Sequence, residues 1–540
     1  MKLSLEGIKD AAAWESKGYH LPAYDVNEIK KNTDEAPEWV HFGAGNIFRA
    51  YHARLAQELI EKGLMKSGIV VAEGFDYEII DKAYKPYDDL SILAILKSDG
   101  SVEKQVIASV SASVKLDTSI QDDFTYLKKA FTNKSLKLAT FTITEKGYSL
   151  KGADGKFTSA VNEDMLKGPF KPVSYIGKVS SLLYERYLVG GYPIAMVSTD
   201  NCSHNGQKLY NAIHEFALEW VGNGVADKEF LNYIEDNSKV SFPWSMIDKI
   251  TPRPDDSVKD MIAADGVENP EPVITSFHTY VAPFVNAEES EYLVIEDDFP
   301  NGRPALENAG VIFTDRDTVN KVERMKVTTC LNPLHTSLAV YGCLLGYTRI
   351  SEEMKDEDLL KLINIVGYTE GLPVVTDPGV ISPSDFIDTV VNKRLPNPFM
   401  PDTPQRIACD TSQKIPIRFG ETIKSYISDS SKKVTDLNAI PLVLAGWLRY
   451  AKGIDDNGKE FECSPDPMLS RIQDSLKSLE FGKELDREVT AAVLLPILKN
   501  ETLFATDLVK AKLSDKIIDF FISEMKGAGA VRSTLHSALF

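Results

Sequence analysis

The chain has 540 residues, of which 43% are hydrophobic and 26% charged, and its formal net charge at pH 7 is −19. This length exceeds what one hydrophobic core organises, so we expect at least two domains. The acidic balance disfavours a nucleic-acid partner, because neutralising phosphates requires a basic face.

Secretion, membrane insertion and structural zinc are also disfavoured. The N-terminus lacks the apolar run of a signal peptide, and no later segment reaches the roughly 18 uncharged apolar residues of a membrane helix. The five cysteines are scattered, without a CxxC pair, which argues against a disulfide framework and a structural zinc site. We therefore expect a cytoplasmic protein that binds neither nucleic acid nor membrane, as a monomer or small homo-oligomer.

Residues 1–36 are expected to be an irregular extension, and an α/β segment follows over residues 37–316. Its expected strands are "EWVHFGAG" (38–45), "GIVVAEG" (68–74), "LSILAILKS" (90–98), "LKLATFTIT" (136–144) and "YPIAMVSTD" (192–200). Residues 46–63 have helical spacing and end at Gly63, which is typical of a helix C-terminus. Strands and helices alternating at this spacing predict a parallel sheet with crossover helices.

Residues 317–540 are expected to form a mostly helical second domain. The helix-like segments are 335–347, 357–368, 438–453, 486–500 and 514–527, interrupted by the proline-rich loop "RLPNPFMPDTP".

A glycine turn follows the first strand. Gly43 and Gly45 stand between a strand and a helix, as in dinucleotide-binding folds, where one glycine permits the tight turn and the next lets a pyrophosphate approach the helix N-terminus. Phe48 occupies the place of the third glycine. We expect the first residues of this helix, Asn46, Ile47 and Phe48, to join the two glycines in binding the cofactor.

Two acidic residues follow the second strand. Glu73 ends it, 28 residues after Gly45, and Asp76 is close behind. Either carboxylate at this strand end would bind the adenosine ribose hydroxyls and favour NAD over NADP. A carboxylate in a surface loop is the alternative for each.

Three further polar loops follow strands or adjoin prolines. Glu145 stands beyond the fourth strand, and Asn201 beyond the fifth, within "STDNCSHNG". In open parallel sheets, ligands bind at the carboxyl ends of the strands. The segment "SMIDKITPRP" adds Asp248 and Lys249. Turn formation alone also explains such Asx-rich loops.

Another polar set lies in "KVTTCLNPLHTSLAVYG", before a helix-like segment. Asn332 and His335 are three residues apart and share one face of a helix. The structural alternatives are a helix N-cap for Asn332 and a buried core histidine for His335.

These motifs occur in the order found in one family. "GAGNIFRA", "TITEKGY", "STDNCSHNG", "SMIDKITP", "VIEDDFPNGRP", "KVTTCLNPLH" and "PLVLAGWLRYAKGIDDNG" together resemble the mannitol dehydrogenase family of polyol-specific long-chain dehydrogenases, over residues 36–510. The resemblance implies a Rossmann-type N-terminal domain, a helical C-terminal domain, an active site in the cleft between them and metal-independent hydride transfer with NAD(H).

The resemblance also implies residue roles. Lys326 matches the general acid/base, Asn201 and Asn332 match amides that polarise the substrate oxygen, and His335 matches a substrate-binding residue. Substrate-binding roles are further implied for Asp248, Lys249, Arg406 and Lys414, and a role in the proton path for Glu145. Reducing a ketone creates an alkoxide that needs donors aimed at its oxygen and one proton, which amides and a lysine supply without a metal.

The chain departs from the family pattern at two positions. Lys326 stands six residues before Asn332, where the family has five, so either a helix bulge absorbs the extra residue or the lysine role moves, with Lys321 next in line. Lys249 replaces an arginine, which keeps the charge but loses the bidentate fork.

The basic residues favour an anionic substrate, and we predict NADH-dependent reduction of D-fructuronate to D-mannonate at C2, as in hexuronate catabolism. Tagaturonate/altronate and fructose/mannitol are alternatives within the family. A nucleotide-binding sensor without catalysis is the alternative of another class.

Overall fold

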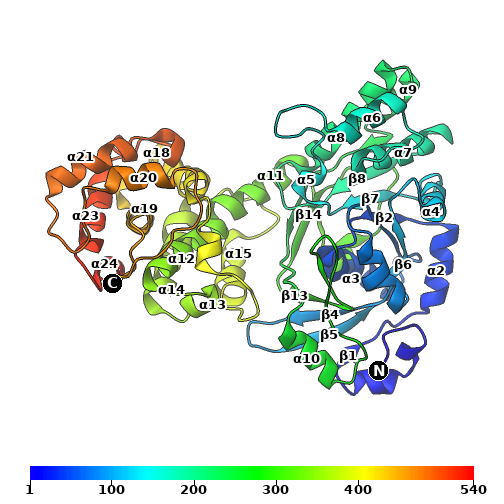
Figure 1. The fold of residues 1–540 in the computed structure, drawn as a ribbon, viewed down its shortest axis with the longest axis horizontal. Helices are drawn as coiled ribbons and strands as arrows, with labels where there is room; N and C mark the ends of the chain where they lie inside the picture. Colours follow the sequence, from blue (N-terminus) through cyan, green and yellow to red (C-terminus); the bar gives the residue numbers. More distant parts are fainter. The chain divides into compact units, whose positions relative to one another are not determined.

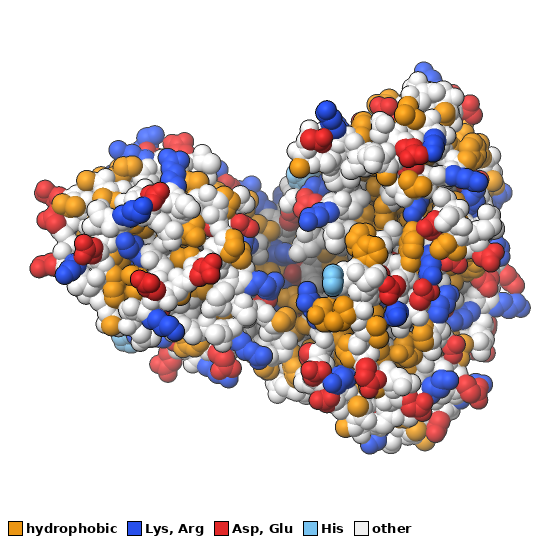
Figure 2. Space-filling view, in the orientation of Figure 1, with side chains coloured by type: hydrophobic (Ala, Val, Ile, Leu, Met, Phe, Trp, Pro, Cys, Tyr) orange, Lys and Arg blue, Asp and Glu red, His pale blue; other side chains and the backbone are white.

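The computed structural model describes all residues from Met1 to Phe540 and divides into two compact units. The N-terminal unit comprises Met1–Lys97 and Ser101–Asn320, and the C-terminal unit comprises Ser98–Gly100 and Lys321–Phe540 (Figure 1). Lys/Arg and Asp/Glu side chains are interspersed over the face shown in Figure 2. None of the helices combines the length and the hydrophobicity that crossing a bilayer requires.

A six-stranded parallel sheet forms the centre of the N-terminal unit, as predicted. Its strand order is β6-β3-β2-β7-β8-β9, and every neighbouring pair is parallel. The strands are β6 (Val110–Lys115), β3 (Ile69–Glu73), β2 (Trp39–Phe42), β7 (Leu138–Phe141), β8 (Ile194–Ser198) and β9 (Val240–Ser241).

Helices cover both faces of this sheet, because alternate side chains of its strands enter two different hydrophobic clusters. Phe42 of β2 packs in the cluster that includes residues of α4 (Gln121–Phe131), α7 (Tyr175–Leu188) and α8 (Asn205–Gly222). Trp39, at the other end of β2 and on its opposite face, packs in the other cluster, with residues of α3 (Ala53–Glu61). Helices lie on both faces of the sheet (Figure 1), and the four central strands β3, β2, β7 and β8 are buried along their whole length.

One expected strand of the parallel sheet belongs elsewhere. Residues 90–98 contain β4 (Ser91–Leu96), which forms an antiparallel hairpin with β5 (Val102–Ile107) in a separate sheet of order β1-β5-β4-β13. The short connection around Gly100 permits only an antiparallel return, since a parallel return needs a crossover of a dozen or more residues. The place in the parallel sheet is taken by β6.

Residues 1–36 are not irregular, contrary to the expectation. They contain α1 (Ala11–Glu15), β1 (Tyr19–His20) and α2 (Val26–Glu35). Strand β1 pairs in parallel with β5. Trp14 is fully buried, so this segment is part of the N-terminal unit.

Two small sheets complete the N-terminal unit. The first contains β10 (Ser245–Asp248), β14 (Tyr292–Glu296) and β15 (Ile312–Thr314). The second is a hairpin of β11 (Val273–Ile274) and β12 (Tyr280–Val281). The remaining strand, β13 (Phe284–Glu288), pairs in parallel with β4.

The C-terminal unit is helical, as predicted. Its longer helices include α12 (Asn332–Leu345), α14 (Glu357–Asn364), α19 (Ala439–Tyr450), α21 (Arg487–Leu498), α23 (Ser514–Glu524) and α24 (Ala530–Leu539). Every residue of α19 is buried, as expected for a helix that is hydrophobic on all sides. The Glu370 carboxylate accepts the backbone N–H groups of Asn438, Ala439 and Ile440, which satisfies the start of α19.

A buried carboxyl lies against α12 in this unit. Glu353, at the end of α13 (Ile350–Glu353), is fully buried, and neither of its carboxyl oxygens has a hydrogen-bond partner. A Cβ at Gly342 would lie 2.0 Å from Oε1, so the glycine makes room for this carboxyl. Burial, followed by the charge of Asp356, raises the pKa of Glu353 to about 9.

Because of this raised pKa, folding binds a proton at Glu353 between its unfolded pKa near 4.5 and its folded pKa near 9. The contribution of Glu353 to the free energy of unfolding therefore falls as pH rises, by up to about 1.4 kcal/mol per pH unit. When the pH is raised from about 6 to about 8, the melting temperature of Glu353→Gln should therefore fall less than that of the wild type. Calorimetry measures this, with Glu352→Gln as an exposed control, and an unchanged pH dependence would contradict the buried titration.

Candidate active site

The glycine turn has the geometry that a pyrophosphate site requires. Gly43 has φ +103°, and a Cβ there would lie 2.2 Å from the carbonyl oxygen of Thr142. Gly45, at the start of the following helix, would carry a Cβ with no atom within 4 Å. The protein itself therefore requires glycine at position 43, whereas at position 45 the missing side chain leaves open space for a ligand.

Asn46, Ile47 and Phe48, which were predicted to bind the cofactor, differ in the contacts and burial of their side chains. The Asn46 side chain accepts a hydrogen bond from the buried Arg49 guanidinium at 2.9 Å. Phe48 is fully buried, and its ring stacks on His41 with a centroid distance of 4.3 Å. Its side chain is therefore part of the core, and only its backbone N–H is suited to the predicted cofactor contact. Ile47 is partly buried and packs against the same core.

The Glu73 carboxylate holds the turn to the end of β3. Oε2 accepts the backbone N–H of Ala44 at 2.8 Å, while Oε1 accepts those of Phe75 at 2.8 Å and Asp76 at 3.1 Å. Burial raises the pKa of Glu73, and these three donors oppose that shift. Because both oxygens already bind backbone amides, the structure gives Glu73 a positioning role, in contrast to the predicted ribose contact.

Asp76 retains one oxygen without a partner. Its Oδ2 accepts the Thr275 hydroxyl at 2.6 Å, whereas the buried Oδ1 has no hydrogen-bond partner. Asp76 is only 1% exposed. Of the two predicted carboxylates, Asp76 is the one with an oxygen that has no hydrogen-bond partner.

Two predicted site loops are held together at the carboxyl edge of the sheet. Asp200 accepts the backbone N–H groups of Ile143 at 3.0 Å and Thr144 at 2.8 Å, so the β8 loop with Asn201 is fixed to the β7 loop with Glu145. Burial raises the pKa of Asp200.

Asn205, buried at the start of α8, joins a third segment to these loops. Its amide donates to the carbonyl oxygens of Asp200 and Ser245, both at 3.0 Å. Ser245 begins β10, which ends at the buried Asp248. The N-terminal unit therefore gathers Glu145, Asn201 and Asp248 on connected segments.

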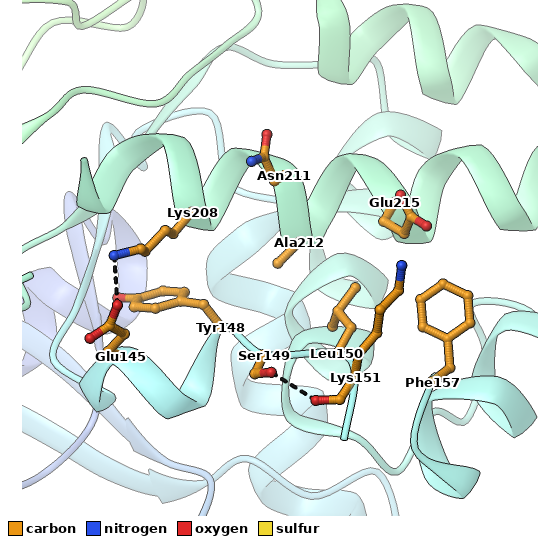
Figure 3. A pocket seen from close by; sticks show the side chains of 10 residues that line it. All are labelled: Glu145, Tyr148, Ser149, Leu150, Lys151, Phe157, Lys208, Asn211, Ala212 and Glu215. Atoms are coloured by element: carbon orange, nitrogen blue, oxygen red, sulfur yellow. Dashed lines mark hydrogen bonds and ion pairs between the residues drawn. The ribbon is translucent and has the colours of Figure 1, made fainter. Parts of the chain in front are cut away.

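Glu145 itself points to a surface pocket. It lies on the short helix α5 (Thr144–Gly147) and is exposed. Its carboxylate forms an ion pair with Lys208, with 2.7 Å between Lys208 Nζ and Glu145 Oε1 (Figure 3). The pocket has a volume of about 440 Å³ and also contains Tyr148, Lys151 and Phe157 in its lining. No other predicted site residue lines it, so the structure does not extend the predicted proton path beyond Glu145.

Lys249 is used inside the protein rather than presented to a ligand. Its ammonium donates to the Glu288 carbonyl at 2.6 Å and to Glu291 at 2.8 Å, and its side chain is 2% exposed. Glu291 also binds Arg54. Burial lowers the pKa of Lys249. These contacts indicate a structural ion pair in place of the predicted substrate contact.

A helix bulge is present at Lys326. The first turn after α11 (Arg316–Met325) is a π-helix over Lys326–Cys330, in which Leu331 N–H donates to Lys326 O at 3.1 Å. A π-turn accommodates one extra residue within a helix. The π-turn therefore accommodates the additional residue between Lys326 and Asn332. This is the helix bulge expected from the sequence as one of two alternatives. Lys326 is buried, at 4% exposure.

The N-cap alternative for Asn332 does not hold, whereas His335 is buried, as its structural alternative expects, but with a ring nitrogen that lacks a partner. Asn332 is the first residue of α12, but it makes no side-chain cap, and its amide is partly exposed. The buried Nε2 of His335 has no hydrogen-bond partner, although Asp402 Oδ2 lies 3.4 Å away. Burial, followed by nearby cations, lowers the pKa of His335 to about 3, so its imidazole is neutral.

The charges of Arg418, Arg406, Arg394 and Lys414 act on His335 and contribute to the lowering of its pKa. Arg406 pairs with Asp402, and Lys414 donates to the carbonyl oxygens of Ile407 and Cys409. Arg418 donates to the Thr336 hydroxyl and, at 3.5 Å, to the carbonyl oxygen of Asn332. The C-terminal unit therefore places Asn332 and His335 near a basic group whose charge is balanced in part by Asp402.

Two members of this basic group were not predicted from the sequence. Arg418 follows Lys414 by four residues, a helical spacing that places both on one face and was an available signal. Arg394, buried in a π-helix over Val390–Arg394 before the proline-rich loop, had no comparable signal.

The glycine turn and the Asp76 carboxylate fit a dinucleotide, and no group of three or more His, Cys, Asp or Glu side chains is arranged to hold a metal ion. The open space at Gly45 and the unpartnered Asp76 oxygen are the features that fit the pyrophosphate and the ribose.

Comparison with known proteins agrees with these features. Residues 37–308 match the mannitol dehydrogenase Rossmann domain, and residues 318–518 match the mannitol dehydrogenase C-terminal domain. A D-mannonate oxidoreductase of Thermotoga maritima is 52% identical over 100% of this chain and 99% of its own. A polyol:NADP oxidoreductase of Gluconobacter oxydans is 29% identical over 84% of this chain and 87% of its own.

Two solved structures have the same fold. A D-sorbitol dehydrogenase in substrate-free form has a TM-score of 0.77 at 26% identity, covering 97% of this chain and 98% of that one. The mannitol 2-dehydrogenase of Pseudomonas fluorescens, in a ternary complex with NAD and D-mannitol, has a TM-score of 0.65 at 25% identity, with 99% of both chains covered. The chain belongs to the mannitol dehydrogenase family of oxidoreductases.

Proposed function

We propose that this enzyme interconverts D-fructuronate and D-mannonate with NAD(H). The observation that carries the proposal is the group of four cations around the neutral His335. A substrate carboxylate would neutralise part of this charge through charge-assisted hydrogen bonds, which a neutral polyol cannot do. Tagaturonate carries the same charge, and the 52% identity to a D-mannonate oxidoreductase favours fructuronate over it.

The proposed cofactor is NAD rather than NADP. Asp76 and Glu73 are carboxylates at the end of β3, and the nearby Glu78 accepts the backbone N–H of Ser276 at 3.0 Å. A 2′-phosphate would meet this negative charge, whereas ribose hydroxyls can donate to it. The choice has to be tested, since a polyol:NADP oxidoreductase is among the relatives.

The proposed chemistry assigns a proton donor and an amide donor of the C-terminal unit to the reacting oxygen. NAD(H) supplies or accepts the hydride when bound. Lys326 is proposed to give its proton to the oxygen at C2 during reduction and to remove it in the reverse direction. Asn332, whose amide does not cap its helix, is proposed to donate to the same oxygen, where negative charge develops.

The glycine turn offers a matched pair of variants. Gly43→Ala should lower stability by at least about 1–3 kcal/mol, because the backbone is unfavourable for a side chain and a Cβ would clash. Gly45→Ala should leave the melting temperature unchanged, yet weaken NADH binding by about tenfold or more, equivalent to about 1.4 kcal/mol. Thermal unfolding and fluorescence titration with NADH measure the two effects. Unchanged NADH affinity in Gly45→Ala would place the pyrophosphate elsewhere.

A substrate panel tests the proposed reaction. With fructuronate, tagaturonate and fructose against NADH and NADPH, kcat/KM should be highest for fructuronate with NADH. Fructose should be slower by about 10- to 100-fold, since a hydrogen bond to a charged group is worth about 1.5–3 kcal/mol. Arg406→Met should lower kcat/KM for fructuronate more than for fructose. Turnover of fructose alone would show that the uronate assignment is wrong.

The two candidate lysines can be separated by substitution. Lys326→Ala should reduce kcat by about 10²–10⁴-fold, the usual contribution of general acid–base catalysis, while NADH binding is retained. Lys321→Ala, on α11, should have little effect on kcat. The opposite pattern, with full activity in Lys326→Ala, would move the acid/base role away from the π-turn.

A further inference from the structure

Two aromatic rings are exposed at the end of β3. Phe75 is 68% exposed and Phe277 is 55% exposed, and their ring centroids lie 5.0 Å apart at an interplanar angle of 57°. Single exposed apolar residues are common, but two phenylalanines in contact form an apolar surface that binding another flat apolar group would cover.

Hydrogen bonds hold this pair from both sides. The backbone N–H of Phe75 donates to Glu73, and Phe277 lies at the tip of the β11–β12 hairpin. Thr275, before the tip, donates to Asp76, and the backbone N–H of Ser276 donates to Glu78. The hairpin is thus fixed to the strand end that carries the predicted ribose contact.

The order of these features along the strand end matches the order of groups in a dinucleotide. One carboxylate, that of Glu73, binds Ala44 in the glycine turn through Oε2 and Phe75 through Oε1. The turn suits a pyrophosphate, and Asp76 suits the ribose attached to it. The group that follows the ribose is the adenine, a flat ring that stacks on aromatic side chains.

We propose that Phe75 and Phe277 form the adenine-binding surface of the enzyme. This inference rests on the proposed NAD(H) dependence and adds to it a specific contact on the hairpin. Adenine stacking on these rings would cover apolar surface that is otherwise in contact with water.

Calorimetric titration with ADP-ribose, which contains the adenine but no nicotinamide, tests the contact directly. Phe75→Ala and Phe277→Ala should each raise the Kd for ADP-ribose by about 5- to 100-fold, the range found for loss of aromatic stacking on a base. Phe75→Trp should retain near wild-type affinity. Phe170→Ala is the matched control, since Phe170 is a 59% exposed phenylalanine with one aromatic neighbour, Tyr184.

Turnover with a shortened cofactor separates adenine stacking from general damage. The alanine variants should lower kcat/KM for NADH but not for reduced nicotinamide mononucleotide, which lacks the adenine. Unchanged Kd for ADP-ribose in both variants, or an equal loss with both cofactors, would overturn the proposal and leave the rings as hairpin packing. If the wild type bound neither NADH nor ADP-ribose, the proposed cofactor itself would be wrong.

Discussion

The buried Glu73 carboxylate is the interaction on which the organisation of the candidate cofactor site depends. It connects the amide of Ala44, in the glycine turn, to those of Phe75 and Asp76, after β3. A carboxylate removed from water is costly unless its oxygens are hydrogen-bonded, and three backbone donors satisfy that requirement here. Losing this side chain would leave three amides without a partner and release the turn from the neighbouring strand end, so the cofactor surface and the fold share one anchor.

In the C-terminal unit, the charges to be stabilised are positive, whereas that of Glu73 is negative. Arg394, Arg406, Lys414 and Arg418 are concentrated around one imidazole, although the chain as a whole is strongly acidic. Arg418 is buried enough for its pKa to fall to about 10, and it remains charged at neutral pH. Burial and these cations keep the His335 imidazole neutral, and its buried Nε2 has no hydrogen-bond partner. An acidic surface does not prevent recognition of an anion when cations are concentrated locally.

The sequence predicted the parallel sheet, the helical second unit and the glycine turn, because each depends on local hydrophobic periodicity and glycine chemistry. It failed where pairing partners are distant or ambiguous. The run at β4 reads like any buried strand, and only its pairing with β5 assigns it to another sheet. Trp14 gave no pattern that distinguished a packed extension from an irregular one.

The prediction of site residues from the sequence was limited for a similar reason, because spacing does not reveal which groups a side chain contacts. A carboxylate following a strand is recognisable in a sequence, but whether its oxygens face a ribose or backbone amides is decided by contacts such as those of Glu73. Arg394 belongs to the basic group only through the folded arrangement of the π-helix that carries it. Lys249 kept the charge of the family arginine, yet its ion pair with Glu291 was not visible in the spacing.

The extra residue near Lys326 shows how a family motif can change in length without losing its geometry. In a regular α-helix, one inserted residue would rotate all that precedes it by about 100° relative to α12. The π-turn over Lys326–Cys330 confines the insertion to one wide turn, so α11 and α12 on either side continue as regular helices. Such single-turn bulges are rare and are frequently found at functional sites. The chain has π-turns at other positions too, such as Phe48–His52 and Ile365–Gly371, so the turn at Lys326 explains how the longer motif fits and does not by itself assign the proton donor.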